Sequence, residues 1–340
     1  MFNLTKLREK IDNKVILITG GSGTWGRGLT KLLLEELNPK EIRIFSRNEY
    51  NQVRMQRKFN DERIKYIIGD VRDNDALNNS IKNVDIVYHL SCLKHVPICE
   101  AQPDEAIKTN IQGSINVAEC AILNNVKYVV DVSSDKSVNP LNMYGMTKQV
   151  GERYMMNKHG KSNTNFCCLR AGNVIGTDGS VIPYWIKELT KENGVPNIKL
   201  TEESMTRFWI PLKNILYYLI ESLFNPGCII IPEMKSCRMD TLLNVLLKLY
   251  PVEKVNAEKI PIRPGEKLHE IIISKEERYR TWHNTKVEEF DRYIIYSVDS
   301  AIDYHIQSEE LSSEFSIEKD FEKLCSMIKK GIEDIKEIEL

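Results

Sequence analysis

The sequence predicts an α/β fold, in which a parallel, doubly wound sheet carries helices on both faces and is joined to a smaller mixed α/β lobe. Short apolar runs that are typical of buried parallel strands alternate with helical patterns along the first half of the chain. A glycine-rich turn directly follows the first of these runs, which is the context that a phosphate-binding turn needs. The six expected strands are residues 14–19, 41–45, 64–68, 85–90, 127–131 and 165–170.

The composition is typical of a soluble globular protein with an ample core. The chain has 340 residues, of which 42% are hydrophobic and 28% are charged. The formal net charge of -1 gives no basic field that would favour nucleic acid or an anionic membrane as a partner. Residues 1–10 are charged and lack the apolar region of a signal peptide, and no apolar run approaches the roughly 18 residues that span a bilayer. We therefore expect a cytoplasmic protein.

The cysteines and histidines show no spacing that is typical of a metal or redox site. None of the eight cysteines forms a C-x-x-C pair, and most lie inside apolar runs. The six histidines show no H-x-x-x-H pattern. The sequence therefore predicts buried, reduced thiols and no metal site.

The turn after the first strand contains Gly20, Gly23 and Gly26, with Thr24 and Trp25 between them. Glycines let the backbone approach a pyrophosphate, and the start of the following helix offers free N–H groups and a positive dipole end. The spacing differs from G-x-G-x-x-G by one inserted residue, and a tight turn alone would also require glycine. The order of strand, turn and helix favours dinucleotide binding.

The end of the second strand bears on the choice between NAD and NADP. An NAD site usually has an acidic residue here to hold the ribose 2′-hydroxyl, but this chain has Ser46, Arg47 and Asn48. Serine and arginine would accept a 2′-phosphate, so NADP is favoured over NAD. The alternative is that Arg47 is a solvated loop residue and that Glu49 takes the acidic role.

Two groups of polar side chains are expected at the carboxyl edge of the sheet. Tyr144 and Lys148 are four residues apart, so they share one face of a helix. We expect the ammonium of Lys148 to lower the pKa of Tyr144, which would make Tyr144 a general base. Ser134, Asp135 and Lys136 follow the strand at 127–131, where open α/β sheets bind ligands. An ordinary loop ion pair is the alternative interpretation of Asp135 and Lys136.

The pattern changes after about residue 175. Prolines at 183, 196, 211, 226, 232, 251, 261 and 264 divide the chain into short pieces, and the last thirty-odd residues are rich in Glu and Lys at helical spacing. We predict a dinucleotide-binding domain over 1–174 with its core from about residue 14, mainly a substrate-binding lobe over 175–300, and a helical tail over 301–340.

These motifs resemble a known family. The glycine turn together with Tyr144-x-x-x-Lys148 resembles the extended short-chain dehydrogenases/reductases, whose nucleotide-binding domain is of the Rossmann type. Five further strings resemble the short, soluble UDP-N-acetylglucosamine 4,6-dehydratases of bacterial nonulosonate (pseudaminic acid) and capsule sugar pathways, over about residues 14–299. The chain departs from that family's usual residues at Trp25, at Ser91-Cys92 and at Ser133-Ser134. The strings are residues 45–49, 93–97, 134–140, 205–209 and 263–270.

The resemblance implies a reaction on a UDP-sugar. Tyr144 would take the proton of the 4-hydroxyl while hydride leaves C4 for the cofactor, and Ser134 would hold the 4-ketone. Lys136, as a neutral amine with a lowered pKa, would remove the C5 proton. Asp135 would protonate the departing 6-hydroxyl before hydride returns to C6.

The resemblance also assigns binding residues and an oligomeric state. A homo-oligomer, either a dimer or a hexamer, is implied. The cofactor would contact Gly20, Gly23, Thr24, Trp25, Gly26, Ser46, Arg47, Asn48, Asp70, Val71, Leu90, Ser91, Lys94, Asn110, Tyr144 and Lys148. The substrate would contact Lys94, Asn173, Arg207, Arg263 and Glu266.

Two other functions are compatible with the scaffold. A nucleotide-sugar 4-epimerase or reductase would share Tyr144 and Lys148 but would have no use for an acid and a base aimed at C5 and C6, so Asp135 and Lys136 favour the dehydratase. A non-catalytic NADP-binding regulator would typically lack the tyrosine or the lysine, and this chain keeps both.

Overall fold

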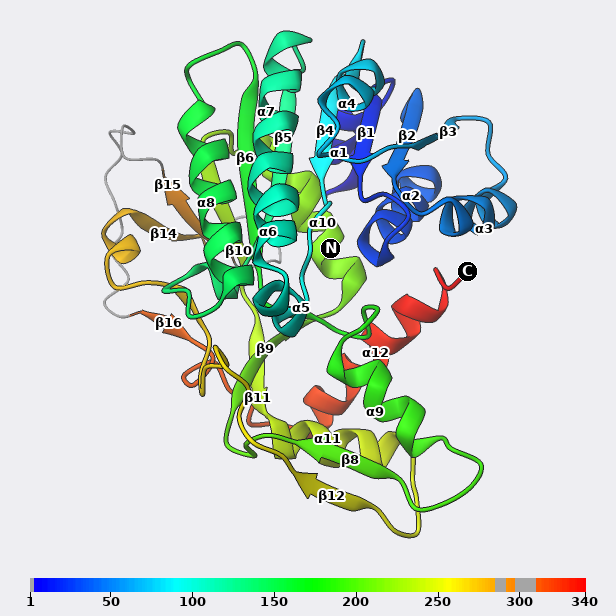
Figure 1. Ribbon diagram of the computed structural model, residues 1–340, viewed down its shortest axis with the longest axis vertical. Helices are drawn as coiled ribbons and strands as arrows, with labels where there is room; N and C mark the ends of the chain where they lie inside the picture. Colours follow the sequence, from blue (N-terminus) through cyan, green and yellow to red (C-terminus); the bar gives the residue numbers. More distant parts are fainter. Residues whose placement is uncertain (1–2, 285–291, 297–309) are drawn as a thin grey trace.

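The computed structural model describes residues 3–284, 292–296 and 310–340, and its largest element is a nine-stranded sheet (Figure 1). The strands of this sheet are β1 Val15–Thr19, β2 Glu41–Ser46, β3 Ile64–Ile68, β4 Ile86–His89, β5 Tyr128–Ser134, β6 Asn165–Ala171, β10 Cys228–Pro232, β14 Thr281–Asn284 and β15 Arg292–Tyr296. Their order is β14-β15-β10-β6-β5-β4-β1-β2-β3. The seven strands from β10 to β3 are parallel, and β15 and β14 pair antiparallel at one edge.

Helices cover both faces of this sheet, because alternate strand residues point to opposite sides. Ile16 and Ile18 face one apolar core, which is shared with α1 Leu4–Ile11, α2 Thr24–Glu36, α3 Glu49–Phe59 and α10 Leu212–Glu221. Leu17 faces a second core, which is shared with α4 Asn74–Ile81, α7 Gly113–Leu123 and α8 Met143–Lys158. The predicted doubly wound α/β fold is confirmed.

Each of the six predicted strands is present, but the sheet extends beyond them. β10, β14 and β15 come from the segment that was expected to form the lobe. The expected boundary at residues 174/175 therefore does not coincide with the edge of the sheet. The expected boundary at 300/301 lies outside the described residues.

The lobe lies beyond the carboxyl ends of the parallel strands (Figure 1). Its own core gathers Trp185, Trp209, Leu242 and Leu246. Its elements are α9 Val181–Leu189, α11 Met239–Leu249, β8 Asn197–Leu200 paired with β12 Asn256–Lys259, a sheet of β7 Asn173–Val174, β9 Thr206–Ile210 and β11 Lys235–Arg238, and β13 Ile271–Ile273 paired with β16 Leu311–Ser312.

One late helix, α12 (Phe321–Lys336), packs against both parts of the molecule. Leu324 and Ile328 belong to the core of the lobe, whereas Ile335 and Ile338 belong to the core between the sheet and α2. The Nε of Arg27 donates a hydrogen bond to the carbonyl oxygen of Ile338 at 3.2 Å. The helical tail that the Glu- and Lys-rich pattern predicts is therefore part of the folded core.

The connection between β4 and α7 is also helical, through α5 Val96–Ala101, α6 Pro103–Ala106 and a π-helical segment, Ile107–Gln112.

Within the described ranges, no helix combines the length and apolar character needed to cross a bilayer.

Candidate active site

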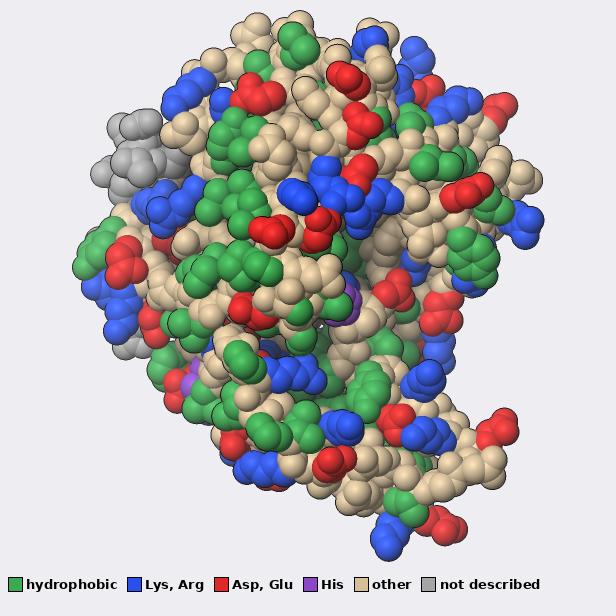
Figure 2. Space-filling model, viewed as in Figure 1, with side chains coloured by type: hydrophobic (Ala, Val, Ile, Leu, Met, Phe, Trp, Pro, Cys, Tyr) green, Lys and Arg blue, Asp and Glu red, His purple; other side chains and the backbone are tan. Residues whose placement is uncertain are grey.

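A cavity of about 890 Å³ lies between the carboxyl edge of the sheet and the lobe, where the surface is hollowed (Figure 2). Nearly all of the predicted site residues line it. They come from the β1–α2 turn, the ends of β2 to β6, the first turns of α8, and the lobe. The predicted residues in the wall are Gly20, Gly23, Thr24, Trp25, Gly26, Ser46, Arg47, Asn48, Asp70, Val71, Leu90, Ser91, Lys94, Ser134, Lys136, Tyr144, Lys148, Asn173, Arg207, Arg263 and Glu266.

The glycine turn is a close-packed cradle at the start of α2. Gly20 has a φ of +66°, and a Cβ there would lie 2.9 Å from the backbone nitrogen of Ser91. A Cβ at Gly26 would lie 2.2 Å from the carbonyl oxygen of Gly21, so α2 can approach β1 only without a side chain there. Gly23 is the N-cap and supplies no side-chain cap for the first N–H groups of α2, and the residues of this first turn line the cavity.

The end of β2 bears no acidic side chain at positions 46–48. The Ser46 hydroxyl is buried, donates to the Ser22 hydroxyl at 2.9 Å and accepts from Gln52 at 2.9 Å. Arg47 is 54% exposed, and its Nη1 lies 3.7 Å from Oδ2 of Asp70. Arg47 is therefore the cation at this end of the cavity that can reach a ligand, whereas Ser46 shapes the turn.

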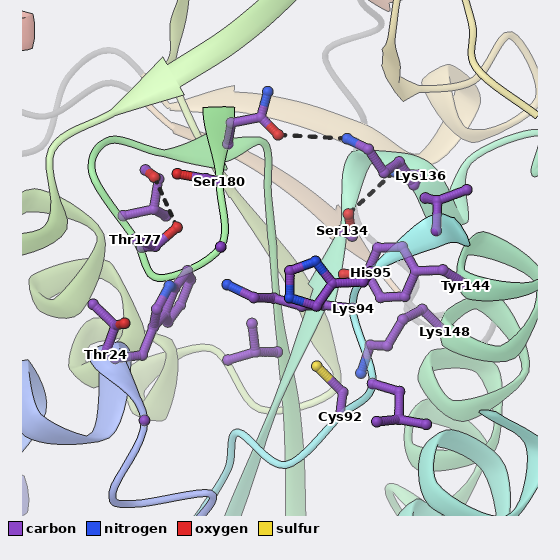
Figure 3. Close-up of a pocket in the computed structure, with 18 of the residues that line it drawn as sticks. Thr24, Cys92, Lys94, His95, Ser134, Lys136, Tyr144, Lys148, Thr177 and Ser180 are labelled. Atoms are coloured by element: carbon purple, nitrogen blue, oxygen red, sulfur yellow. Dashed lines mark hydrogen bonds between the residues drawn. The ribbon is translucent and has the colours of Figure 1, made fainter. Parts of the chain in front are cut away.

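Tyr144 and Lys148 lie side by side on α8, as their spacing predicts (Figure 3). The expected lowering of the pKa of Tyr144 is nevertheless wrong for this structure. Burial raises the pKa of Tyr144, and a hydrogen bond with Ser134 opposes burial only in part. The Nζ of Lys148 instead lies 3.4 Å from Oδ1 of Asp131, which is fully buried on β5. The carboxylate of Asp131 is therefore the main partner of the Lys148 ammonium.

Asp135 and Lys136 form the expected pair, at 3.1 Å between Asp135 Oδ1 and Lys136 Nζ. Asp135 is fully buried and does not line the cavity, and its Oδ1 also accepts a hydrogen bond from Ser134 at 2.9 Å. Burial raises the pKa of Asp135, which favours the protonated acid. Lys136 faces the cavity and also lies 3.3 Å from Oε1 of Glu270.

The lowered pKa that was expected for Lys136 is wrong for this structure. Burial does lower the pKa of Lys136, but the carboxyl groups of Asp135 and Glu270 outweigh burial and raise it overall. Lys136 is therefore held as an ammonium between two acidic side chains. Glu270 was quoted in a motif but not predicted as a site residue.

Lys94, in the cavity wall, and Asp178, just behind it, are linked beside the glycine turn. The Nζ of Lys94 donates to the carbonyl oxygen of Asp178 at 2.8 Å. The carboxylate of Asp178 accepts from Thr24 at 2.7 Å and from Arg27 at 3.0 Å. The segment after β7 is thus tied both to the end of β4 and to the start of α2.

Arg207 and the loop at 263–266 bring the lobe to the cavity. The guanidinium of Arg207 donates to the carbonyl oxygens of Thr206 at 2.8 Å and Lys267 at 3.0 Å, so its planar head is fixed. The carboxylate of Glu266 accepts from the backbone nitrogen of Arg263 at 3.1 Å, which shapes this turn. Both arginines line the cavity, and such a pair suits a diphosphate.

Asn110 is the one predicted cofactor residue that lies away from the cavity wall. It is buried, its amide nitrogen donates to the carbonyl oxygen of Leu93 at 2.9 Å and to Thr147 at 3.0 Å, and its oxygen accepts from the nitrogen of Leu93 at 2.8 Å. Asn110 therefore fixes the loop that carries Lys94, and its direct contact with a cofactor stays a prediction.

The fold and the paired Tyr144 and Lys148 at the sheet edge define an extended short-chain dehydrogenase/reductase. A family profile described as polysaccharide biosynthesis protein matches residues 16–292. The chain belongs to this family.

The similar proteins carry more than one activity in their names. An inverting UDP-N-acetylglucosamine 4,6-dehydratase of Campylobacter jejuni subsp. jejuni serotype O:23/36 (strain 81-176) is 38% identical over 90% of this chain and 87% of its own length. A UDP-glucose 4-epimerase of Rickettsia bellii (strain OSU 85-389) is 38% identical over 78% of this chain and 79% of its own length. The X-ray structure of Pen from Bacillus thuringiensis is 34% identical and superimposes with a TM-score of 0.86, over 94% of this chain and 99% of that chain.

Proposed function

We propose that the protein is an NADP-dependent dehydratase that converts UDP-N-acetylglucosamine to a UDP-4-keto-6-deoxy-hexosamine. The observation that carries this proposal is the convergence of two chemistries in one cavity. Tyr144 with Lys148 suits oxidation of an alcohol, and Lys136 with Asp135 suits elimination of water next to a ketone.

The glycine cradle fits a dinucleotide. The close contacts at Gly20 and Gly26 leave no room for side chains, and the start of α2 offers free N–H groups to a pyrophosphate. Arg47 and the lack of an acidic residue at positions 46–48 support NADP over NAD. A bound nicotinamide would supply the hydride acceptor for C4 and the hydride donor for C6.

Oxidation at C4 would use the side chains at the start of α8. Tyr144 takes the proton of the 4-hydroxyl, and the Ser134 hydroxyl, which lines the same cavity, is placed to donate to the oxygen of the ketone. Because burial raises the pKa of Tyr144, the phenolate needs nearby positive charge, and the ammonium of Lys148 is the cation on the same helix face.

Elimination of water would use Asp135 and Lys136, the two residues that follow Ser134 in the chain. Lys136 faces the cavity, so its ammonium can lose a proton to the solvent there, and the resulting amine takes the C5 proton. Asp135, whose raised pKa favours the acid form, supplies the proton for the departing 6-hydroxyl. Because Asp135 does not line the cavity, this proton passes through the Ser134 hydroxyl or follows a side-chain rotation.

A nucleotide-sugar 4-epimerase is the second candidate, since relatives of equal identity carry that name. An epimerase needs the oxidation at C4 but leaves C5 and C6 untouched. The buried acid and the cavity-facing lysine beside Ser134 favour the dehydratase.

The test is NMR of the purified protein with UDP-N-acetylglucosamine in deuterated water. We expect a 4-keto-6-deoxy product that carries solvent deuterium at C5, and the coupling at C5 distinguishes inversion, which the name of the Campylobacter relative favours, from retention. Asp135→Asn should lose dehydration while the protein still binds NADP. An unchanged 6-hydroxymethyl group with epimerisation at C4 would move the assignment to the epimerase.

Two further expectations complete the proposal. We expect a homo-oligomer, which sedimentation of the purified protein would test, and a cytoplasmic location, which cell fractionation would test.

A further inference from the structure

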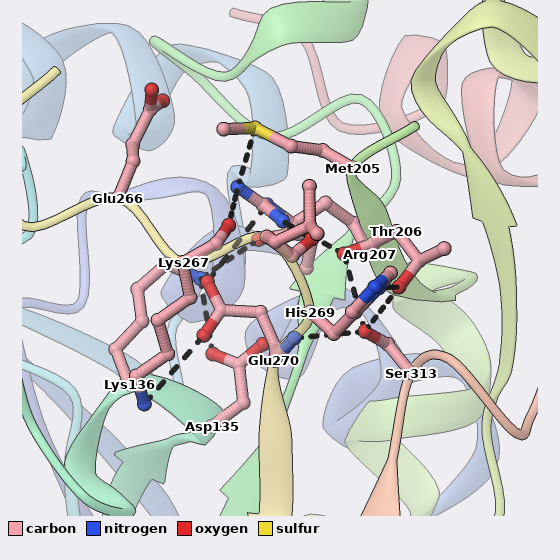
Figure 4. A network of polar contacts seen from close by, with 12 residues as sticks. Asp135, Lys136, Met205, Thr206, Arg207, Glu266, Lys267, His269, Glu270 and Ser313 are labelled. Atoms are coloured by element: carbon pink, nitrogen blue, oxygen red, sulfur yellow. Dashed lines mark hydrogen bonds and ion pairs between the residues drawn. The ribbon is translucent and has the colours of Figure 1, made fainter. Parts of the chain in front are cut away.

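Glu270 stands at the centre of a buried polar cluster that also contains both elimination residues (Figure 4). It directly precedes β13 and is only 3% exposed. Its Oε1 lies 3.3 Å from the Nζ of Lys136 and 3.8 Å from the Nε of Arg207. Its Oε2 lies 4.0 Å from the Nζ of Lys267. Three cations from three different segments therefore surround this carboxylate.

Asp135 and Glu270 form a carboxyl pair that shares one cation. The Nζ of Lys136 lies within 3.3 Å of an oxygen of each. The other oxygens, Asp135 Oδ2 and Glu270 Oε2, are buried, and neither has a hydrogen-bond partner among the described residues. Two carboxylates that are held against the same ammonium resist ionising together, so this arrangement favours one proton on the pair.

The surroundings decide which carboxyl group holds that proton. Burial raises the pKa of Asp135, the ammonium of Lys136 opposes this, and the charge of Glu270 adds to it. Burial would also raise the pKa of Glu270, but Lys136, Arg207 and Lys267 together lower it. Asp135 is therefore the acid, and Glu270 is the anion.

We propose that Glu270 is a positioning residue that keeps the shared proton on Asp135 and anchors the Lys136 ammonium at the cavity wall. This inference rests on the proposed dehydratase function. Without the charge of Glu270, Asp135 ionises at lower pH, and Lys136 loses its proton at lower pH. Glu270 therefore raises the pKa of both the acid, Asp135, and the base, Lys136, although it is more than 130 positions away from them in the sequence.

The backbone around Glu270 is fixed independently of its carboxylate, so a substitution can preserve the fold. The backbone nitrogen of Glu270 donates to the hydroxyl of Ser313 at 2.8 Å, and the backbone carbonyl oxygen of Glu270 accepts from the Ser313 nitrogen at 2.8 Å. Arg207 keeps its hydrogen bonds to backbone carbonyl oxygens without Glu270. We therefore expect the KM for the UDP-sugar to change little in Glu270→Gln.

The test compares the dependence of kcat on pH in wild type, Glu270→Gln and Glu270→Asp. In Glu270→Gln both limbs of the profile should move to lower pH by about one unit or more, because a like or opposite charge within contact distance shifts a pKa by this amount. Glu270→Asp keeps the charge and should return the limbs toward their wild-type positions. Glu314→Gln removes a half-exposed carboxylate near His269 and should leave the profile unchanged.

Infrared spectroscopy gives a readout that does not need turnover. Wild type at neutral pH should show the C=O band of a buried carboxylic acid, which disappears in Asp135→Asn and titrates at lower pH in Glu270→Gln. The inference would be overturned if the pH profile of kcat and the titration of the C=O band were the same in Glu270→Gln as in wild type. If wild type forms no 4-keto-6-deoxy product, the proposed function fails, and the infrared band still decides whether Glu270 controls the proton on Asp135.

Discussion

The Nζ of Lys148 lies 3.4 Å from Oδ1 of Asp131, and both side chains are buried between β5 and α8. The carboxylate raises the pKa of Lys148 against the opposing effect of burial, so the lysine beside Tyr144 stays charged. Asp131 was not predicted as a site residue, although it sets the charge state of one that was.

Asp131→Asn should destabilise the protein and slow turnover. The substitution leaves the ammonium of Lys148 buried without its counter-ion, and breaking a buried pair in this way costs about 3–5 kcal/mol. Urea unfolding at neutral pH measures the loss. Glu119→Gln removes the surface pair with Lys158 and should cost no more than about 1 kcal/mol. Equal losses in the two variants would contradict this account of Asp131.

His89 should make the protein less stable as the pH falls. Burial, with a smaller effect of Lys148, lowers the pKa of His89 to about 3, and its ring nitrogens contact Thr19 and Ser114. In the unfolded chain histidine titrates near pH 6.5, so between about pH 6.5 and pH 3 the unfolded state binds the extra proton. Stability therefore falls by about 1.4 kcal/mol for each pH unit within that window.

His89→Gln isolates this effect, because glutamine does not titrate. The variant should be less stable than wild type at pH 7, since it loses a buried hydrogen bond, but the gap should narrow as the pH falls toward 4. Urea unfolding at several pH values measures the gap. A gap that stays constant over this range would show that His89 is not the titrating group.

Arg47→Ala should weaken the binding of NADP and leave the binding of NAD nearly unchanged. Loss of a charge-assisted hydrogen bond of about 1.5–3 kcal/mol corresponds to a roughly ten- to hundredfold rise in Kd for NADP. Calorimetry with both dinucleotides measures the two constants. Arg54→Ala, on α3, removes an arginine that stacks on Tyr50 outside the cavity and should change neither constant. Equal weakening of NAD and NADP by Arg47→Ala would argue against a 2′-phosphate contact.

Asn110→Ala should loosen the loop that carries Lys94. The substitution removes three hydrogen bonds, two part-buried ones to Leu93 and a buried one to Thr147, and leaves the backbone groups of Leu93 without these partners at a cost of about 1–3 kcal/mol each. Thermal unfolding should shift downward by several degrees, and cofactor affinity should fall with it. Asn124→Ala on the surface end of α7 serves as the control, with a smaller shift. An unshifted unfolding temperature for Asn110→Ala would contradict its role as a loop anchor.

The sequence correctly predicted the structural features that depend on residues close together in the chain. The apolar run at 64–68 became β3 with the same bounds, and the glycine turn became the start of α2. The spacing of Tyr144 and Lys148 correctly placed them on one helix face. Each of these features is decided by strand length, backbone sterics or helical periodicity, which a single sequence displays directly.

Contacts between distant segments were not predictable in the same way. Helical spacing could not show that Asp131 would compete for Lys148, or that Glu270 would raise the pKa of Lys136. In the string at 263–270, Arg263 and Glu266 were predicted as substrate residues. Only the fold shows that the last residue of this string, Glu270, is buried beside Lys136. The strands β10, β15 and β14, which extend the sheet beyond β6, were missed because β10 is followed by lobe segments before the sheet resumes.

The packing of α12 also has a consequence for how the chain folds. Its last turn belongs to an apolar core with residues that precede it by about 300 positions, such as Leu29 with Ile335, and beyond the helix Arg27 donates a hydrogen bond to the carbonyl oxygen of Ile338. Closing so large a loop is entropically slow, and a chain emerging from the ribosome would expose this seam of α2 and α10 until α12 arrives. The packing around α2 is therefore completed only after α12 has been synthesised, and until then this apolar seam is open to non-native association.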